Sequence, residues 1–232
     1  MKRWPDLIIF DCDGVLVDSE VLSLARTGAA LERLGLKWDE ARIRELFLGV
    51  SAQTMGEIAE HALGAPLPPE FQSDLARDIL ADFERELKGV DGIGEALSRL
   101  DARVCVASSS SIERIRASLR IVGYAHLFES RIFSASEVAR GKPEPDLFLF
   151  AARRMGASPA DCLVVEDSVH GVTAARRAEM AVFGFTGGAH AQGDEYSGRL
   201  RAAGAAVVFH DMSELAGLVD ERRRGMVQRV AR

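Results

Sequence analysis

The sequence predicts an α/β fold built on an open parallel sheet, and three observations lead to this prediction. Six short apolar segments recur along the chain, and each is a continuous run rather than an alternation of apolar and polar residues. Such runs are typical of parallel strands buried on both faces. Segments with apolar residues spaced three and four apart lie between them. Hydrophobic residues make up 47% and charged residues 28% of the 232 residues, which is ordinary for a globular protein with a sizeable core.

The six apolar segments are the expected strands. In chain order they are residues 7–10 (LIIF), 103–107 (RVCVA), 131–133 (RIF), 162–165 (CLVV), 181–185 (AVFGF) and 205–209 (AAVVF). Helical patterns lie next to them at residues 94–100, 111–120, 145–156 and 168–180. Because strand and helix alternate, the chain is expected to form a parallel sheet with connecting helices.

One interval interrupts this alternation. Between residues 18 and 87 no strand is predicted, and helical segments occupy 23–35, 39–49, 52–64 and 69–87. Gly35, Gly49 and Gly64 close successive segments, as C-cap residues do. We therefore predict a helical insert, residues 18–88, in a core formed by residues 1–17 and 89–232. The segment KGVDGIG (88–94) is the expected return linker, with glycines that permit a turn or hinge.

Charge and hydropathy argue against several classes of function. The formal net charge of −6 disfavours nucleic acid as a partner, and the basic run at 220–232 is interpreted as a solvated helix end. No apolar run reaches the roughly 18 to 20 residues that span a bilayer, so no membrane association is expected and the location is expected to be cytoplasmic. We also expect a monomer. Cys12, Cys105 and Cys162 are interpreted as small core residues.

Polar side chains follow three of the predicted strands at their carboxyl ends. Asp11 and Asp13 follow the first strand, Ser108 follows the second, and Glu166 and Asp167 follow the fourth. In an open α/β sheet, ligands bind beyond the carboxyl ends of the strands. These side chains are therefore expected to meet at one edge of the sheet.

The acidic residues in this group predict a metal site. Asp11, Asp13 and Asp167 within a few ångströms of one another would repel unless a cation lies between them. Carboxylate oxygens suit Mg²⁺, which completes its coordination with water and a substrate phosphate. Lys142, in the loop GKPEP, is placed to hold both an aspartate and a phosphate, and Ser108 to donate to a phosphoryl oxygen.

Taken singly, these residues have ordinary structural explanations. An Asp-x-Asp pair after a strand is often part of a turn, and Ser108 alone is the expected N-cap of the helix at 110–121. Ser168 is expected to cap a helix and His170 to lie on a helix surface. Only their joint occurrence, each at the end or flank of a strand, favours a functional site.

Four segments resemble the signature motifs of the haloacid dehalogenase superfamily: FDCDGVLVDSE (10–20), VASSS (106–110), GKPEPDLF (141–148) and VVEDSVHG (164–171). The helical insert resembles that of the small-cap subgroup. The resemblance implies a Rossmann-like parallel sheet core with an inserted all-helical cap domain. It also implies a Mg²⁺-dependent phosphatase that acts on a small phosphorylated sugar, sugar acid or polyol.

The same resemblance implies roles for individual residues. Asp11 would be the nucleophile that forms an aspartyl-phosphate. Asp13 would act as general acid and then as base, with its backbone carbonyl on the metal. Phosphate-binding residues would be Ser108, Ser109 and Lys142. The metal would be held by Asp11, Asp13, Glu166 and Asp167.

Three other activities are less favoured. Members of the superfamily that cleave carbon–halogen bonds lack the acid at Asp13. A β-phosphoglucomutase-type sugar phosphomutase is the nearest alternative, but Ser23 and Ala52 stand where its cap has a histidine and an arginine, and Ser111 where a lysine is expected. Because these cations would hold a second phosphate, hydrolysis is favoured. A receiver-like phosphoacceptor signalling module has no helical insert after its first strand, and its phosphorylated aspartate is not on that strand.

Substrate choice is expected to lie in the helical insert. The residues expected to face the substrate are Glu20, Ser23, Leu24, Arg26 and the loop 49–54, with Gly49, Ser51 and Gln53.

One departure from the family pattern lies outside the insert, because Glu179 stands where relatives usually have a glycine. A left-handed conformation at that position would cost Glu179 up to about 1 kcal/mol.

Overall fold

The core is a six-stranded parallel sheet. The computed structural model describes residues 4–191 and 193–230, with side chains described as far as residue 225. The strands lie in the order β3-β2-β1-β4-β5-β6. They are β1 (Leu7–Phe10), β2 (Arg103–Ser108), β3 (Ile132–Ser134), β4 (Cys162–Glu166), β5 (Ala181–Phe185) and β6 (Val207–Phe209). The expected α/β fold and the positions of all six strands are confirmed.

The core helices lie between and after the strands. They are α5 (Ile93–Arg99), α6 (Ile112–Ile121), α7 (Ala125–Phe128), α8 (Asp146–Arg154), α9 (Val169–Arg177), α10 (Asp194–Ala203) and α11 (Leu215–Val230). Four of them match the helical patterns in the sequence, whereas α7 and α10 were not predicted. The basic run at 220–232 lies mostly in α11, and its side chains from residue 226 onward lie outside the described residues.

Helices cover both faces of the sheet, which explains why the strands are continuous apolar runs. Successive residues of β1 point to opposite faces. Leu7 and Ile9 pack in one apolar cluster with residues of α8, α9 and α10. Ile8 and Phe10 pack in a second cluster with residues of α5, α6 and α11. All four side chains are fully buried, so every position of this strand must be apolar.

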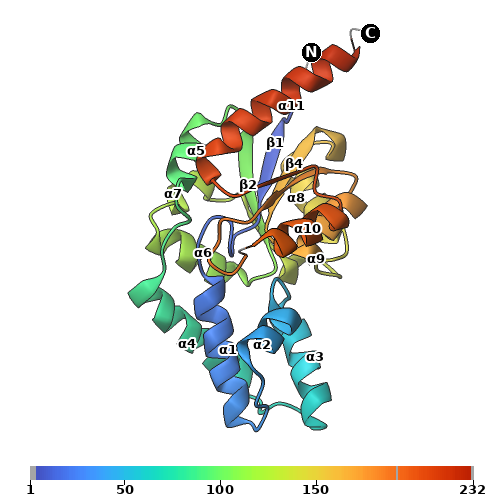
Figure 1. Cartoon of the computed structure of the whole chain (residues 1–232). Coiled ribbons are helices and arrows are strands. Elements are labelled where there is room, and N and C mark those ends of the chain that lie inside the picture. Colours follow the sequence, from blue (N-terminus) through green and yellow to red (C-terminus); the bar gives the residue numbers. More distant parts are fainter. Residues whose placement is uncertain (1–3, 192, 231–232) are drawn as a thin grey trace.

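Four helices are inserted between β1 and α5, and they are called the cap helices below. They are α1 (Glu20–Arg33), α2 (Glu40–Phe47), α3 (Ala52–Leu63) and α4 (Phe71–Glu86). Figure 1 shows them gathered at one end of the core, with α11 at the opposite end. The chain passes between core and cap helices twice at adjacent points, because the N–H of Asp18 donates to the carbonyl of Lys88 at 2.9 Å and Val17 pairs with Gly89.

The cysteines agree with the expectation from composition. All three cysteines are buried and free, and burial, with Asp13 and Asp11 nearby, raises the pKa of the Cys12 thiol well above its usual value. The interpretation of the cysteines as core residues is therefore confirmed. Among the described residues, no helix combines the length and the apolar character that a membrane span requires.

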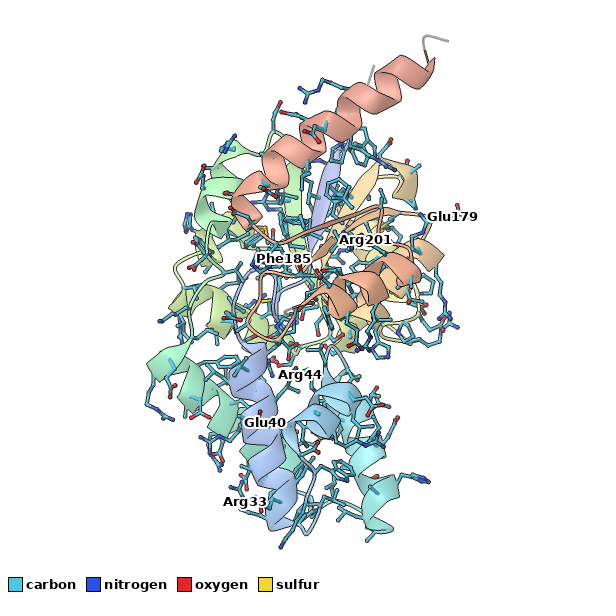
Figure 2. All side chains as sticks on the ribbon, in the orientation of Figure 1. Arg33, Glu40, Arg44, Glu179, Phe185 and Arg201 are labelled. Atoms are coloured by element: carbon cyan, nitrogen blue, oxygen red, sulfur yellow. The ribbon has the colours of Figure 1, made fainter. Side chains whose placement is uncertain are left out.

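Glu179 adopts the left-handed conformation that its position suggested. Its φ is 60°, and its N–H donates to the carbonyl of Arg176 at 3.1 Å, two residues beyond the end of α9. Figure 2 shows Glu179 at the outer edge of the core, on the side away from the cap helices. The side chain is exposed, so the conformation is imposed by the turn and not by a side-chain contact.

Replacing Glu179 by glycine should stabilise the protein. Glycine adopts positive φ without the steric cost that a side chain meets, so Glu179→Gly should raise the free energy of unfolding by about 0.5–1 kcal/mol. Glu221→Gly is the matched control, because Glu221 is exposed in the interior of α11 and the change should cost about 1 kcal/mol. Urea titration of both variants measures the two effects, and destabilisation by Glu179→Gly would contradict the prediction.

Candidate active site

The candidate site forms where β1 and β4 end side by side. Phe10 lies opposite Val165 in the parallel pairing of these strands, and the N–H of Asp11 donates to the carbonyl of Val165 at 3.0 Å. Asp11 and Glu166 therefore occupy neighbouring positions at the carboxyl edge of the sheet. In the observed strand order the connections run in opposite directions from β1, which is where open α/β sheets bind their ligands.

Lys142 joins the two strand ends. Its Nζ lies 2.5 Å from Oδ1 of Asp11 and 2.6 Å from Oε1 of Glu166. The Lys142 side chain is only 2% exposed. Burial by itself would lower the pKa of Lys142, but the carboxylates of Asp11 and Glu166 raise it instead, so the ammonium group stays charged. The structure thus brings together the first, third and fourth of the predicted motifs.

One ammonium group does not compensate the acids gathered around it. Carboxylate oxygens of Asp11, Glu166 and Asp167 lie within 4.8 Å of one another, and all three residues are buried. Burial raises the pKa of Asp11 well above its usual value, although Lys142 opposes the shift. Burial and the charge of Glu166 likewise raise the pKa of Asp167. A divalent cation would remove this excess of buried negative charge.

The donor set fits a hard divalent cation. The three residues offer only carboxylate oxygens, as Mg²⁺ prefers. Oδ2 of Asp167 is buried and accepts no hydrogen bond from any described residue. Nε2 of His190 lies 2.7 Å from this oxygen, but the two atoms do not form a hydrogen bond. An acceptor oxygen left without a donor beside other carboxylates is what a metal ligand requires.

Two glycines make room for these carboxylates. A Cβ on Gly14, whose φ is +79°, would lie 1.9 Å from Oδ2 of Asp167. A Cβ on Gly171 would lie 1.7 Å from Oε1 of Glu166. Both distances are far below van der Waals contact, so any side chain at either position would displace an acid of the site. Gly14 also provides a turn directly after Asp13.

The carboxylate of Asp13 faces hydroxyl groups and an arginine instead of the other acids. Ser19 Oγ donates to its Oδ1 at 2.6 Å, Ser110 Oγ to its Oδ2 at 2.6 Å, and Arg114 Nη2 to its Oδ1 at 2.7 Å. Burial would raise the pKa of Asp13, but Arg114 and the two hydroxyl groups outweigh burial and lower it. Ser108 is a more distant donor, with its Oγ 3.4 Å from Oδ2 of Asp13.

The serines after β2 differ in part from the sequence prediction. Ser111, and not Ser108, caps the following helix, because its side chain accepts the N–H of Arg114. The strand continues through Ser108, so three more residues are needed before α6 can begin. Ser108 Oγ accepts the N–H of Ser110 at 3.1 Å, and Ser109 Oγ donates to the carbonyl of Gly49 at 3.1 Å. Ser168 caps α9, as predicted.

A cavity of about 700 Å³ lies between this edge of the sheet and the cap helices. Its lining includes several predicted site residues, namely Asp11, Asp13, Ser108, Ser109, Lys142 and Glu166 from the core and Glu20, Ser23, Leu24, Gly49 and Ser51 from the cap side. Burial, with the charges of Asp13 and Asp167, raises the pKa of Glu20 to about 8.

Two residues expected to face the substrate have other contacts. Arg26 forms a two-pronged ion pair with Asp82 of α4, at 2.6 and 2.7 Å, and so joins two cap helices. Gln53 is exposed and donates to Glu57 at 3.0 Å, and it is not among the residues that line the cavity. Arg26 thus points toward α4 and Gln53 toward the next turn of its own helix, α3.

Sequence reasoning missed Ser110, Arg114 and His190. Arg114 carried a weak signal, since a basic residue in the first turn of a helix opposes the helix dipole and so invites another explanation. His190 carried none, because it stands in an irregular loop after β5. His170, by contrast, lies half-buried on α9 and outside the cavity lining, as predicted.

The fold and this site together define a class of protein: an α/β enzyme with a carboxylate centre under a helical cap. The chain belongs to the haloacid dehalogenase-like hydrolase family, whose model matches residues 5–179. It is 30% identical over 186 residues to the 6-phosphogluconate phosphatase of Escherichia coli, covering 80% of this chain and 84% of that one. The expected family is thereby confirmed.

Solved structures give the same result. A haloacid dehalogenase-like protein of Agrobacterium tumefaciens is 37% identical, with a TM-score of 0.79, and the match covers 94% of this chain and 98% of that one. A family hydrolase of Deinococcus radiodurans with bound phosphate and sodium is 30% identical, with a TM-score of 0.72, covering 96% and 98% of the two chains.

Divalent cations should stabilise the protein more at high pH than at low pH. Because the pKa values of Asp11 and Asp167 are raised on folding, these groups favour the folded state at low pH and lose that contribution as pH rises through their folded-state pKa values. A bound cation offsets the loss. With Mg²⁺ at about ten times its Kd, we expect Tm to rise by about 2–4 °C at pH 8 and by clearly less at pH 5.5.

Differential scanning calorimetry with and without Mg²⁺ measures this difference. Asp167→Asn should remove most of the Mg²⁺ effect at pH 8, whereas Asp91→Asn, at an exposed position, should leave it intact. An equal Mg²⁺ effect at both pH values would show that cation binding does not involve the acids with raised pKa values.

Proposed function

We propose that this chain is a Mg²⁺-dependent phosphomonoester hydrolase that acts on a small phosphorylated metabolite through an aspartyl-phosphate on Asp11. One observation carries the proposal. The Asp11 carboxylate lines the cavity at the end of the central strand, 2.5 Å from a buried lysine and next to two further buried acids. Membership of a hydrolase family, and a relative that is a 6-phosphogluconate phosphatase, support the reaction type.

The proposed reaction has two displacements at phosphorus. In the first, a carboxylate oxygen of Asp11 attacks, the bond from phosphorus to the ester oxygen breaks, and Asp13 gives its proton to the departing alcohol. In the second, Asp13 takes a proton from water, the water oxygen attacks phosphorus, and inorganic phosphate leaves while the Asp11 carboxylate is restored. Asp13 therefore ends the cycle protonated, as it begins it. Because its pKa is lowered in the structure, binding of the phosphate ester must supply this proton or raise the pKa of Asp13.

The remaining residues would bind and orient the phosphoryl group. The Lys142 ammonium and the Ser108 and Ser109 hydroxyl groups are the proposed ligands of the phosphoryl oxygens. Mg²⁺, held by Asp11, Glu166, Asp167 and the backbone carbonyl of Asp13, would neutralise charge that develops on those oxygens. The cap helices would exclude bulk water from the cavity.

The proposal extends to the setting of the enzyme. A cytoplasmic location is supported by the three buried cysteines, which remain free thiols. The proposed substrates are small phosphate esters, and a monomer is the proposed state in solution. Nucleic acid and membranes have no place in the proposed function, in line with the acidic charge of the chain.

A sugar phosphomutase is the alternative that one observation favours. The cation expected after the second motif is absent at Ser111, but Arg114 lies on the cavity three residues later. The argument against a second phosphate is therefore weaker than the sequence indicated. Formation of glucose 6-phosphate from β-glucose 1-phosphate, with no inorganic phosphate released, would establish the mutase and overturn the hydrolase.

Asp11→Asn should lower phosphate release by about 10³-fold or more while leaving the fold intact, because an amide is neither a nucleophile nor a metal ligand of comparable strength. The measurement is Mg²⁺-dependent phosphate release across a panel of phosphorylated sugars, sugar acids and polyols, with Asp91→Asn as the control that keeps full activity. Residual activity above a few per cent in Asp11→Asn would mean that the nucleophile is wrongly assigned. A stable aspartyl-phosphate from acetyl phosphate, without turnover, would instead indicate a receiver-like module.

A further inference from the structure

Arg114 is a cation in the cavity that the proposed mechanism does not use. It lies in the first turn of α6, and its side chain is 22% exposed. A positive charge at a helix N-terminus is opposed by the helix dipole, and partial burial of the guanidinium adds a desolvation cost. Its position on the cavity wall suggests a ligand-binding role.

The guanidinium group is fixed between the core and the cap helices. Nη2 donates to Oδ1 of Asp13 at 2.7 Å and to Oγ of Ser23, on α1, at 2.8 Å. Its Cζ lies 5.1 Å from the centre of the Phe83 ring, on α4, a distance at which a cation is attracted to the ring face. These contacts hold the plane of the guanidinium before any ligand arrives.

Most of the hydrogen-bonding capacity of Arg114 is unused. An arginine has five N–H donors, and both contacts to described residues come from Nη2. Nη1 and Nε donate to no described residue, and Nε is buried. Nη1 and Nε lie on different edges of the guanidinium, so each offers single donors to an oxygen of an anionic ligand. A buried donor without a partner is costly until an acceptor is brought to it.

The other cations on the cavity wall have partners of their own. Lys142 is bound by Asp11 and Glu166. Arg77 is 69% exposed and pairs with Asp74 at 2.8 Å. Among the described residues that line the cavity, Arg114 is therefore the partly buried cation with donors to spare.

We propose that Arg114 determines specificity by binding a carboxylate on the leaving group of the substrate, so that phosphorylated sugar acids are the preferred substrates. The proposal rests on the proposed function, because it assumes that the phosphoryl group lies at Asp11 and Lys142. A single guanidinium carries one positive charge and so suits a monoanion such as a carboxylate. A second phosphate would place a dianion next to Asp13 with no other cation in contact.

A matched pair of substrates tests this assignment. 6-Phosphogluconate and glucitol 6-phosphate differ in having a carboxylate or a hydroxymethyl group at C1. The wild-type protein with Mg²⁺ should prefer the acid by about 10-fold or more in kcat/KM. Arg114→Met should lower kcat/KM for the acid by about 10²-fold and for glucitol 6-phosphate by less than about 10-fold, so that the preference is lost. Arg114→Lys should keep part of it.

Arg116→Met is the matched control, because Arg116 lies on the same helix and is exposed. It should keep the wild-type preference. An equal loss on both substrates in Arg114→Met would mean that Arg114 only positions Asp13, and would overturn the specificity role. A wild-type enzyme with no preference for the acid, or with a preference for a sugar bisphosphate, would overturn it as well.

Two further measurements keep the result decisive. Thermal melting verifies that the Arg114→Met variant is folded, and if it is not, the Arg114→Lys variant and the wild-type preference decide the question. p-Nitrophenyl phosphate separates the two proposals. If the wild-type protein releases phosphate from p-nitrophenyl phosphate but does not prefer 6-phosphogluconate over glucitol 6-phosphate, the role of Arg114 is overturned and the hydrolase stands. If it releases phosphate from no ester, both proposals are overturned.

Discussion

Buried negative charge at the carboxyl end of β1 is the constraint on which the rest of the site depends. Asp11, Glu166 and Asp167 are each almost fully buried, although an isolated buried carboxylate is strongly disfavoured. Lys142 compensates part of the charge from a loop that comes more than 130 residues after Asp11. The remaining excess is relieved either by a bound cation or by protonation of an acid whose pKa is raised. Stability of the unliganded fold and affinity for a metal are therefore set by the same groups.

The buried acids also restrict which residues can stand next to them in the chain. Gly14 and Gly171 leave the space that the carboxylates of Asp167 and Glu166 occupy. Ser168 both donates to Oε2 of Glu166 and caps α9, so the orientation of one acid is coupled to the start of a helix. The residues of each motif thus have separate tasks. The acids carry the charge, the glycines leave space for the carboxylates, and the serine donates a hydrogen bond that orients one of them.

The parts of the fold that were predictable are those determined by local pattern. Continuous apolar runs such as residues 7–10 and 162–165 predicted the strands. The acids directly after these runs predicted the carboxylate site, because the carboxyl ends of neighbouring parallel strands lie at the same edge of the sheet whatever the loops do. The first residue of α6 was not predictable in this way, as the extension of β2 to Ser108 moved the N-cap to Ser111. The presence of Arg114 and His190 at the site could not be predicted, because it depends on the direction of their side chains in three dimensions and not on sequence spacing.

The cap helices hold the core through a small number of polar contacts. Ser109 bonds the carbonyl of Gly49, Arg120 pairs with Glu84 at 2.6 Å on an exposed surface, and Arg114 bonds Ser23. The exposed pair of Arg120 and Glu84 contributes at most about 1 kcal/mol, and apolar residues of the cap helices also pack in one cluster with residues of the core. Of the three contacts, only that of Arg114 also involves an acid of the site, Asp13.

Closure of the cap helices over a substrate would therefore complete the surroundings of Asp13 and the recognition of the leaving group in one step. An enzyme arranged in this way can keep its chemistry on the sheet edge while its specificity changes with the few residues that face each other across the cavity.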